Sequence, residues 1–164
     1  MNGYPGWMAR LPLSVHSIPG ETATSLASRL AQVNQVPLRE FLRDMGIGIH
    51  SLIAGERAAL TQLAELSGVP VAALRQGTPR TSDGEAWFAG HRFPAASVGG
   101  REVRGCPDCL EAEPGLRGIW SLPFVTICPE HNRPLVTLWT VQDRLDRHEV
   151  TRRLPELDLP AESS

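Results

Sequence analysis

The stretch C-P-D-C at residues 106–109, followed eighteen residues later by C-P-E-H at 128–131, decides the fold. It contains four candidate ligands in two pairs, and each pair has the same two-residue gap that is found in ribbon-type zinc sites. The short gap lets both members of a pair reach one ion from a tight turn. Three thiolates and one imidazole complete a tetrahedral shell, which is typical of a closed structural site. We therefore expect one structural Zn²⁺ ion, held in a zinc ribbon over residues 101–140 by Cys106, Cys109, Cys128 and His131.

The segment between the two pairs is rich in apolar residues, and Trp120 is its largest member. A single tryptophan beside a metal site is more often packing than a platform for nucleic-acid bases, so we expect Trp120 in the ribbon core. The alternative is that the three cysteines only fill a core while His131 lies on the surface. The repeated gap favours the metal site, and the ion would then supply much of the folding free energy of so small a unit.

Composition limits the remaining possibilities. The chain has 164 residues, 41% of them hydrophobic, which is enough for one domain or two very small ones. A net charge of −2 gives no overall attraction to nucleic acid or to anionic membranes. No apolar run approaches the ~20 residues of a membrane span, and the N-terminus shows no secretory signal. Three clustered cysteines favour a reduced cytoplasmic protein over a disulfide framework, and the absence of lysine excludes a Walker-type phosphate loop.

Residues 1–20 are rich in proline and glycine and are expected to form an extended lead-in. Helical periodicity begins after Thr22, which can cap a first helix that Asn34 ends. Three shorter helices are expected to begin at Pro37, near Glu56 and at Pro70. The fold class is therefore mainly α with a small zinc-ribbon β element, and residues 21–80 form the helical module.

The last two helices of this module, residues 61–76, have the pattern of a helix-turn-helix. A small residue (Ala64), a turn glycine (Gly68) and an apolar docking residue (Leu74) occupy the required places. An ordinary helical hairpin is the alternative reading. The first turn of the second helix is apolar and cannot make several bidentate base contacts, so it favours protein docking. The candidates for a weak contact with a DNA backbone or a partner are Arg75, Gln76, Arg80 and Arg104.

The remaining segments carry weaker signals. Residues 81–100 are polar and glycine-rich and are expected to be a linker, anchored by three aromatic residues at 87, 88 and 93. Residues 141–164 are expected to form one exposed charged helix followed by a disordered tail. No paired carboxylates, nucleophile elbow or Rossmann fingerprint is present, so we expect no enzyme.

The order of these motifs resembles the TniQ family of transposition proteins. LPLSVHSIPGETATSLASRLAQVNQ (residues 11–35) resembles the start of that family, LAELSGVPVAALR (63–75) its helix-turn-helix, and CPDCLEAEPGLRGIWSLPFVTICPEHNRPL (106–135) its zinc motif. The positions that match are Pro19, Gly20, Glu21, Ser25, Arg29, Leu30, Ala31, Asn34, Cys106, Pro107, Cys109, Arg117, Trp120, Leu122, Pro123, Cys128, Pro129, His131 and Leu135.

The resemblance implies a non-enzymatic targeting subunit of a cut-and-paste transposon, which couples target recognition to the transposase machinery. Some members of the family bind DNA, and others dock as dimers onto RNA-guided CRISPR effector complexes. The chain ends soon after the zinc motif, so we expect no further DNA-reading domain and favour protein docking, with a homodimer as one arrangement. A zinc-containing helix-turn-helix regulator is the alternative, and a metal-dependent nuclease is a third reading.

Overall fold

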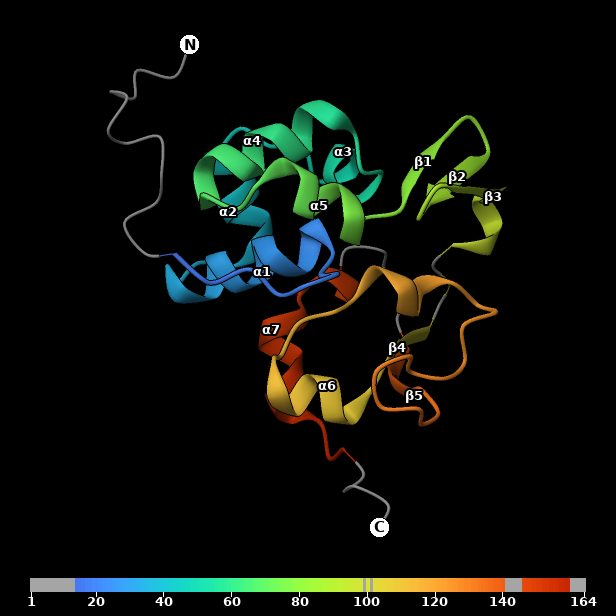
Figure 1. Ribbon diagram of the computed structural model, residues 1–164. Helices are drawn as coiled ribbons and strands as arrows, with labels where there is room; N and C mark the ends of the chain where they lie inside the picture. The colour runs from blue at the N-terminus through green and yellow to red at the C-terminus, as the bar shows by residue number, and fades with distance from the viewer. Residues whose placement is uncertain (1–13, 99, 101, 141–145, 160–164) are drawn as a thin grey trace.

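The computed structural model describes residues 14–98, 100, 102–140 and 146–159. Helices α1 to α5 form one layer, a small sheet (β1–β3) lies at one end of this layer, and the ligand-bearing segment lies against the helices with α7 beside it (Figure 1). The mainly α fold with small β elements is thus confirmed. The expected lead-in falls largely on residues 1–13, which lie outside the described residues.

Helix α1 (Ala23–Val33) is the centre of the helical layer, and it begins and ends where the sequence predicts. The Thr22 side chain accepts a hydrogen bond from the Ser25 backbone N–H, which satisfies one of the free donors of the first turn. Asn34 follows as the C-cap. Leu26 and Leu30 are almost completely buried. Because α1 is covered on several sides, four of its polar residues, Thr24, Ser25, Ser28 and Arg29, are also buried.

Four short helices pack around α1: α2 (Leu38–Asp44), α3 (Ile49–Ile53), α4 (Arg57–Ser67) and α5 (Val71–Gly77). The sequence analysis did not predict α3, because five residues between Gly48 and Gly55 carry too little periodicity to show a helix. Pro37 is the N-cap of α2 and does not occupy its first helical position. The buried apolar residues of this layer form one core, which consists of Ala23, Leu26, Ala27, Leu30, Ala31, Leu38, Phe41, Leu42, Ile47, Leu52, Ala59, Leu60, Leu63, Val69 and Leu74.

Helices α4 and α5 form the helix pair that the 61–76 pattern indicates. Gly68 ends α4 in the left-handed region at a φ of 77°, and its N–H donates to the Ala64 carbonyl over 2.9 Å. Leu74 of α5 is 3% exposed and docks the second helix on the core. This geometry fits a helix-turn-helix and an ordinary hairpin equally well, so the helix-turn-helix, and protein docking by it, stay predictions.

Residues 81–100 differ from the expected linker, because most of them form an antiparallel sheet. Strands β1 (Arg80–Ser82), β2 (Glu85–Phe88) and β3 (His91–Pro94) pair in the order β1-β2-β3, and the short 3-10 helix η2 (Ala95–Ser97) follows. Two-residue turns join the strands, and both residues of each turn have positive φ, at 83–84 and 89–90. This is the geometry of tight β-hairpins. Asp-Gly at 83–84 is a strong sequence signal for such a turn, and the prediction of a linker overlooked it.

The ligand-bearing segment contains a two-stranded antiparallel sheet of β4 (Glu102–Gly105) and β5 (Val136–Thr140). Helix α6 (Pro107–Ala112) and the 3-10 helix η3 (Gly118–Ser121) lie between the strands in sequence. A second core fills this unit, consisting of Val103, Cys106, Cys109, Leu110, Trp120, Cys128 and Leu138. Trp120, expected as ribbon core, is 3% exposed.

The C-terminal segment also differs from the expected exposed helix. Its described part consists of three short pieces, η4 (Asp146–His148), α7 (Val150–Arg153) and η5 (Leu154–Glu156). Val150 is completely buried, and the Thr151 N–H donates to Ser28 of α1 over 3.2 Å. A few apolar residues among many charges are therefore enough to dock this segment. Residues 141–145 and 160–164 lie outside the described residues. The described part of the expected tail, residues 154–159, is not disordered, because Leu154, Leu157 and Leu159 pack against the second core.

The helical layer and the ligand-bearing segment meet along a backbone seam, which we define as residues 20–22, Gly77 and 115–118. The Thr22 N–H donates to the Leu116 carbonyl, and the Gly118 N–H donates to the Gly20 carbonyl, each over 2.9 Å. A Cβ at Gly77 would collide with the Glu21 carbonyl oxygen, and one at Gly118 with the Gly77 carbonyl oxygen. The two units that the sequence indicates therefore pack with their backbones in direct contact.

Candidate metal centre

The first ligand pair is presented by the start of α6. Cys106 is the N-cap of this helix and Cys109 lies in its first turn, with Pro107 at the position where the absence of an N–H costs nothing. The Leu110 N–H donates to the Cys106 carbonyl over 3.0 Å and closes the turn. Both sulfur atoms consequently point to the same side of the helix start.

The second ligand pair is presented by a tight turn before β5. The Asn132 N–H donates to the Cys128 carbonyl, and the Cys128 N–H donates to the Arg133 carbonyl, both over 2.8 Å. Asn132 has a φ of 52°, a conformation that asparagine tolerates better than most residues. This turn directs Cys128 and His131 toward the start of α6.

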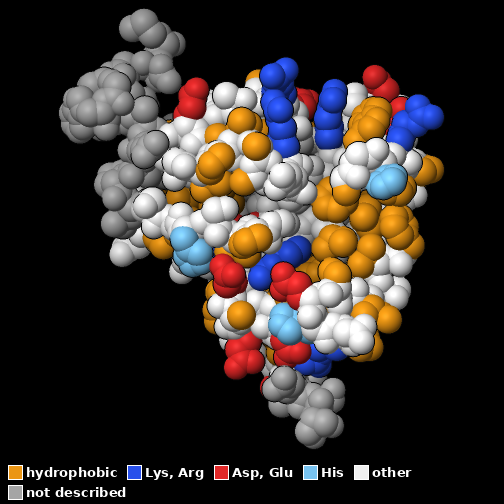
Figure 2. All heavy atoms as spheres, in the orientation of Figure 1, with side chains coloured by type: hydrophobic (Ala, Val, Ile, Leu, Met, Phe, Trp, Pro, Cys, Tyr) orange, Lys and Arg blue, Asp and Glu red, His pale blue; other side chains and the backbone are white. Residues whose placement is uncertain are grey.

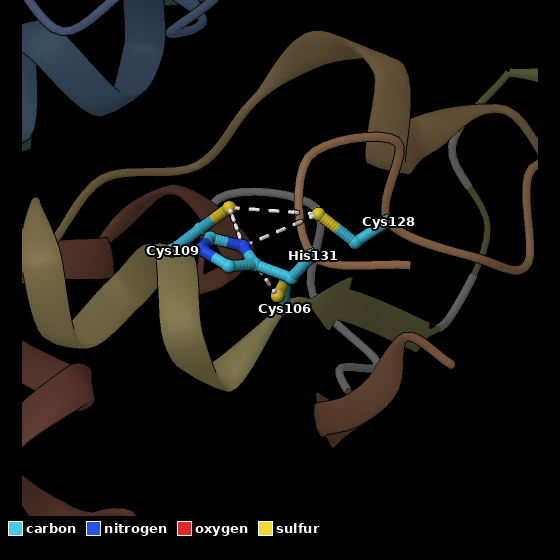
Figure 3. Close-up of side chains that lie close together, drawn as sticks. All are labelled: Cys106, Cys109, Cys128 and His131. Atoms are coloured by element: carbon cyan, nitrogen blue, oxygen red, sulfur yellow. Dashed lines mark hydrogen bonds between the residues drawn. The ribbon is translucent and has the colours of Figure 1, made fainter. Parts of the chain in front are cut away.

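The four ligand atoms lie at the corners of a tetrahedron-sized cluster (Figure 3). The His131 Nδ1 atom is 3.5, 3.2 and 3.7 Å from the Sγ atoms of Cys106, Cys109 and Cys128. The Sγ atoms of Cys109 and Cys128 are 3.6 Å apart. A tetrahedral ion with bonds of about 2.3 Å to sulfur and about 2.0 Å to nitrogen has edges of about 3.5–3.8 Å. The cluster therefore has the dimensions to hold one metal ion.

Two thiols of the cluster differ in how readily they ionise. Burial, together with the neighbouring thiols of Cys128 and Cys106, raises the pKa of Cys109 far above its usual range. Burial also opposes ionisation of Cys128, but hydrogen bonds from the backbone and side chain of His131 outweigh it and lower its pKa to about 7. One thiol of the cluster therefore ionises readily near neutral pH, and several thiolates together require a bound cation.

Charged side chains hold the two ligand pairs in place. Asp108, between the first two cysteines, accepts a hydrogen bond from Arg133 over 3.1 Å, and both side chains are less than a fifth exposed. Arg117 donates to the Cys109 carbonyl over 3.4 Å, and its guanidinium stacks over the Trp120 ring at 5.2 Å. The sequence analysis missed the Asp108–Arg133 pair, although both residues lie next to ligands on either side of the eighteen-residue interval.

The four residues expected at a partner or nucleic-acid contact lie in two different environments. Arg75, Gln76 and Arg80 are exposed at the end of α5 and the start of β1. Arg104 instead donates three hydrogen bonds within the chain, to the carbonyls of Trp120, Leu122 and Val125, over 2.7–2.9 Å. Arg104 is thus a structural clamp on the interval between the ligand pairs. The sequence around Arg104, at the bulge of β4, does not indicate that its side chain binds carbonyls within the chain.

The fold and the site together define a small, mainly helical protein with a Cys₃His cluster, three buried cysteines and an exposed histidine, that could hold a metal ion. The chain matches the model of the TniQ family over residues 12–135, three quarters of its length, and belongs to that family. It is therefore a transposition-associated protein, and the family is one of non-catalytic accessory proteins. No curated protein matches the chain. Among the described residues, no helix is both long enough and apolar enough to cross a membrane.

Proposed function

We propose that this protein is a non-catalytic adaptor of a transposon, which links target recognition, by DNA or by an RNA-guided effector complex, to the transposase machinery. One structural Zn²⁺ ion, bound by the Cys₃His cluster, holds its ribbon together. The thiolate-rich, closed ligand set supports zinc. Free buried thiols also support a reduced cytoplasmic setting.

The observation that carries this proposal is an apolar surface patch, which we call the ribbon patch and define as the half-buried Phe93 and the exposed Phe124 and Ile127. Phe124 is 59% exposed and Ile127 is 51% exposed. The rings of Phe93 and Phe124 are tilted against each other with centroids 5.3 Å apart, so the sheet and the ribbon share the patch. Figure 2 shows hydrophobic side chains gathered where the β1–β3 sheet meets the ribbon. Contiguous exposed apolar surface of this kind marks a site of protein association.

The ribbon patch is held rigidly. The Arg104 clamp fixes the backbone at residues 120, 122 and 125, on both sides of Phe124. The Val125 N–H closes a turn on the Leu122 carbonyl over 2.9 Å. Cys128 follows Ile127 directly and anchors the other end of the loop in the ligand cluster. A partner that binds here therefore pays little entropy to order the loop, which favours the patch as a binding hot spot.

The described face of α5 supports an adaptor over a regulator. Its first turn exposes Ala72, follows the exposed Pro70, and offers no base-reading side chain before Arg75. Direct readout needs several bidentate side chains at the start of the recognition helix. The start of α5 therefore lacks the side chains that the hypothesis of a DNA-binding regulator requires.

A cell-based assay of movement of the element tests the proposal. The double substitution Phe124→Asp/Ile127→Asp should lower the transposition frequency by about 30-fold or more, because it removes two apolar contacts at a hot spot. The matched control is Val33→Asp, since Val33 of α1 is also an exposed large apolar residue, at 37%. Both variants should keep one zinc ion per chain. Unchanged transposition by the double variant would refute the adaptor surface.

The two rival functions have separate tests. A regulator should prefer one duplex over random DNA by about 1,000-fold at physiological salt, whereas an adaptor should show little preference. Cleavage of DNA or RNA by the pure protein with added magnesium or zinc would instead support the nuclease.

A further inference from the structure

The outer face of the β1–β3 sheet carries an arginine–tryptophan–arginine row. Trp87 of β2 pairs with Arg80 of β1 on one side and with Arg92 of β3 on the other. Directly paired residues lie on the same face of a sheet, and the Arg80 guanidinium lies 5.4 Å from the centroid of the Trp87 ring. The opposite face carries Ala86, which is completely buried, and Phe93 of the ribbon patch. The row and the ribbon patch therefore lie on opposite faces of one sheet.

The guanidinium groups of Arg80 and Arg92 have N–H donors available for a ligand. Within the described part of the chain, the guanidinium of Arg80 has no carboxylate or carbonyl partner, only the indole. Arg92 approaches Glu85 at 3.7 Å, and both side chains are largely exposed, so this pair is weak. Trp87 is half-buried, so part of its ring remains accessible.

A third arginine lies close to the row. The Thr81 N–H donates to the Ala54 carbonyl over 2.9 Å, and Gly55 packs against the backbone of Arg80. The exposed Arg57 begins α4 two residues after Gly55, and its neighbour Glu56 is also exposed. In Figure 2, arginine side chains and acidic side chains lie together along the upper edge of the molecule.

We propose that this outer face binds a segment of single-stranded nucleic acid, with one base stacked on Trp87 and phosphates contacted by Arg80 and Arg92. Guanidinium groups match phosphate oxygens in bidentate geometry, and the accessible part of an indole accepts the π-face of any base. A duplex keeps its bases stacked inside, and a small sheet face offers only phosphate contacts to it. An acidic peptide satisfies the arginines but offers no flat ring to stack on the indole. The row therefore fits a single strand better than either.

Fluorescence anisotropy of the zinc-loaded full chain with labelled dT12 and rU12, in 50 mM NaCl, tests this proposal. We expect a dissociation constant of about 10–100 µM for at least one of the two strands. Trp87→Ala should weaken binding by about 5- to 150-fold. Arg80→Ala/Arg92→Ala should reduce the slope of log affinity against log salt by about 1.4, because about 0.7 is lost for each phosphate contact on a single strand.

The charge-matched control is Arg39→Ala/Arg43→Ala, which removes two exposed arginines from α2 and should leave both affinity and slope nearly unchanged. Zinc content and thermal unfolding verify that each variant is folded, and Trp87→Phe, which keeps a smaller ring, should retain part of the affinity. Three results would overturn the proposal: no binding of either strand at 200 µM protein, equal binding by wild type and by both row variants, or tighter binding of a twelve-residue poly-glutamate peptide that the Trp87→Ala change does not affect.

Discussion

The buried ion pair at the start of α1 gives the sharpest prediction. Glu21 and Arg29 have side chains that are 4% and 9% exposed. Arg29 Nε and Nη2 donate to the two carboxylate oxygens of Glu21 over 2.9 and 2.7 Å, and the Ser25 hydroxyl donates to the same carboxylate over 2.7 Å. The change Glu21→Gln keeps the shape of the side chain and removes its charge. It leaves the Arg29 guanidinium buried beside a neutral amide.

The expected cost is about 3–5 kcal/mol of unfolding free energy, because removing one partner of a buried pair leaves the other charge uncompensated. The Arg29 contact with the His16 carbonyl, at 2.7 Å, remains but does not neutralise the charge. With a urea m value of about 2 kcal/mol/M, the unfolding midpoint should fall by about 1.5–2.5 M. The double variant Glu21→Gln/Arg29→Met should lose less than the sum of its two single changes, since it removes both charges.

Urea unfolding followed by circular dichroism, with zinc in slight excess, measures these values. Glu113→Gln is the matched control, because Glu113 pairs with His16 at 3.3 Å in an exposed position and its loss should cost under about 1 kcal/mol. A cost for Glu21→Gln no larger than that of the control, or strict additivity in the double variant, would refute the role of the buried pair.

Three further predictions concern the metal centre and the seam. Cys109→Ser or Cys128→Ser should abolish stoichiometric zinc and unfold residues 102–140, as measured by metal analysis and by hydrogen exchange; a variant that kept its zinc would contradict the ligand set. Lowering the pH from 8 to 5.5 should weaken zinc binding progressively, because the pKa of Cys128 is about 7 and that of Cys109 is higher, so protons compete with the ion; affinity that is independent of pH, measured with a zinc indicator, would contradict this. Gly77→Ala should destabilise the chain by about 1–3 kcal/mol, because its Cβ meets the backbone of Glu21, whereas Gly100→Ala, where no atom lies near and φ is not positive, should cost much less, as urea unfolding measures.

The sequence predicted those parts of the structure that local chemistry determines. Thr22 and Asn34 bound α1 as expected, since capping depends on a few adjacent residues. The four ligands lie together as their spacing predicts, because a two-residue gap fixes the geometry within each pair. Trp120 is buried against them.

The remaining features depend on contacts between distant residues. The three strands at 80–94 are short, and their alternation is visible only once the turns at 83–84 and 89–90 are recognised. Arg104 was read as surface charge, but its partners lie sixteen to twenty-one residues away. Val150 lies in a charged segment, and its burial depends on the surface of α1. Periodicity and composition contain no information about such partners.

The eighteen residues between the ligand pairs are attached to the rest of the protein at several points by hydrogen bonds. Leu116 and Gly118 bond to the start of α1, the Arg104 clamp fixes residues 120–125, and a ligand closes each end. An insertion or deletion in this interval would shift at least one of these attachments out of reach. The interval has to reach from the first ligand pair to the start of α1 and return to the second ligand pair. Its length is therefore constrained, as is the identity of the ligands at its ends.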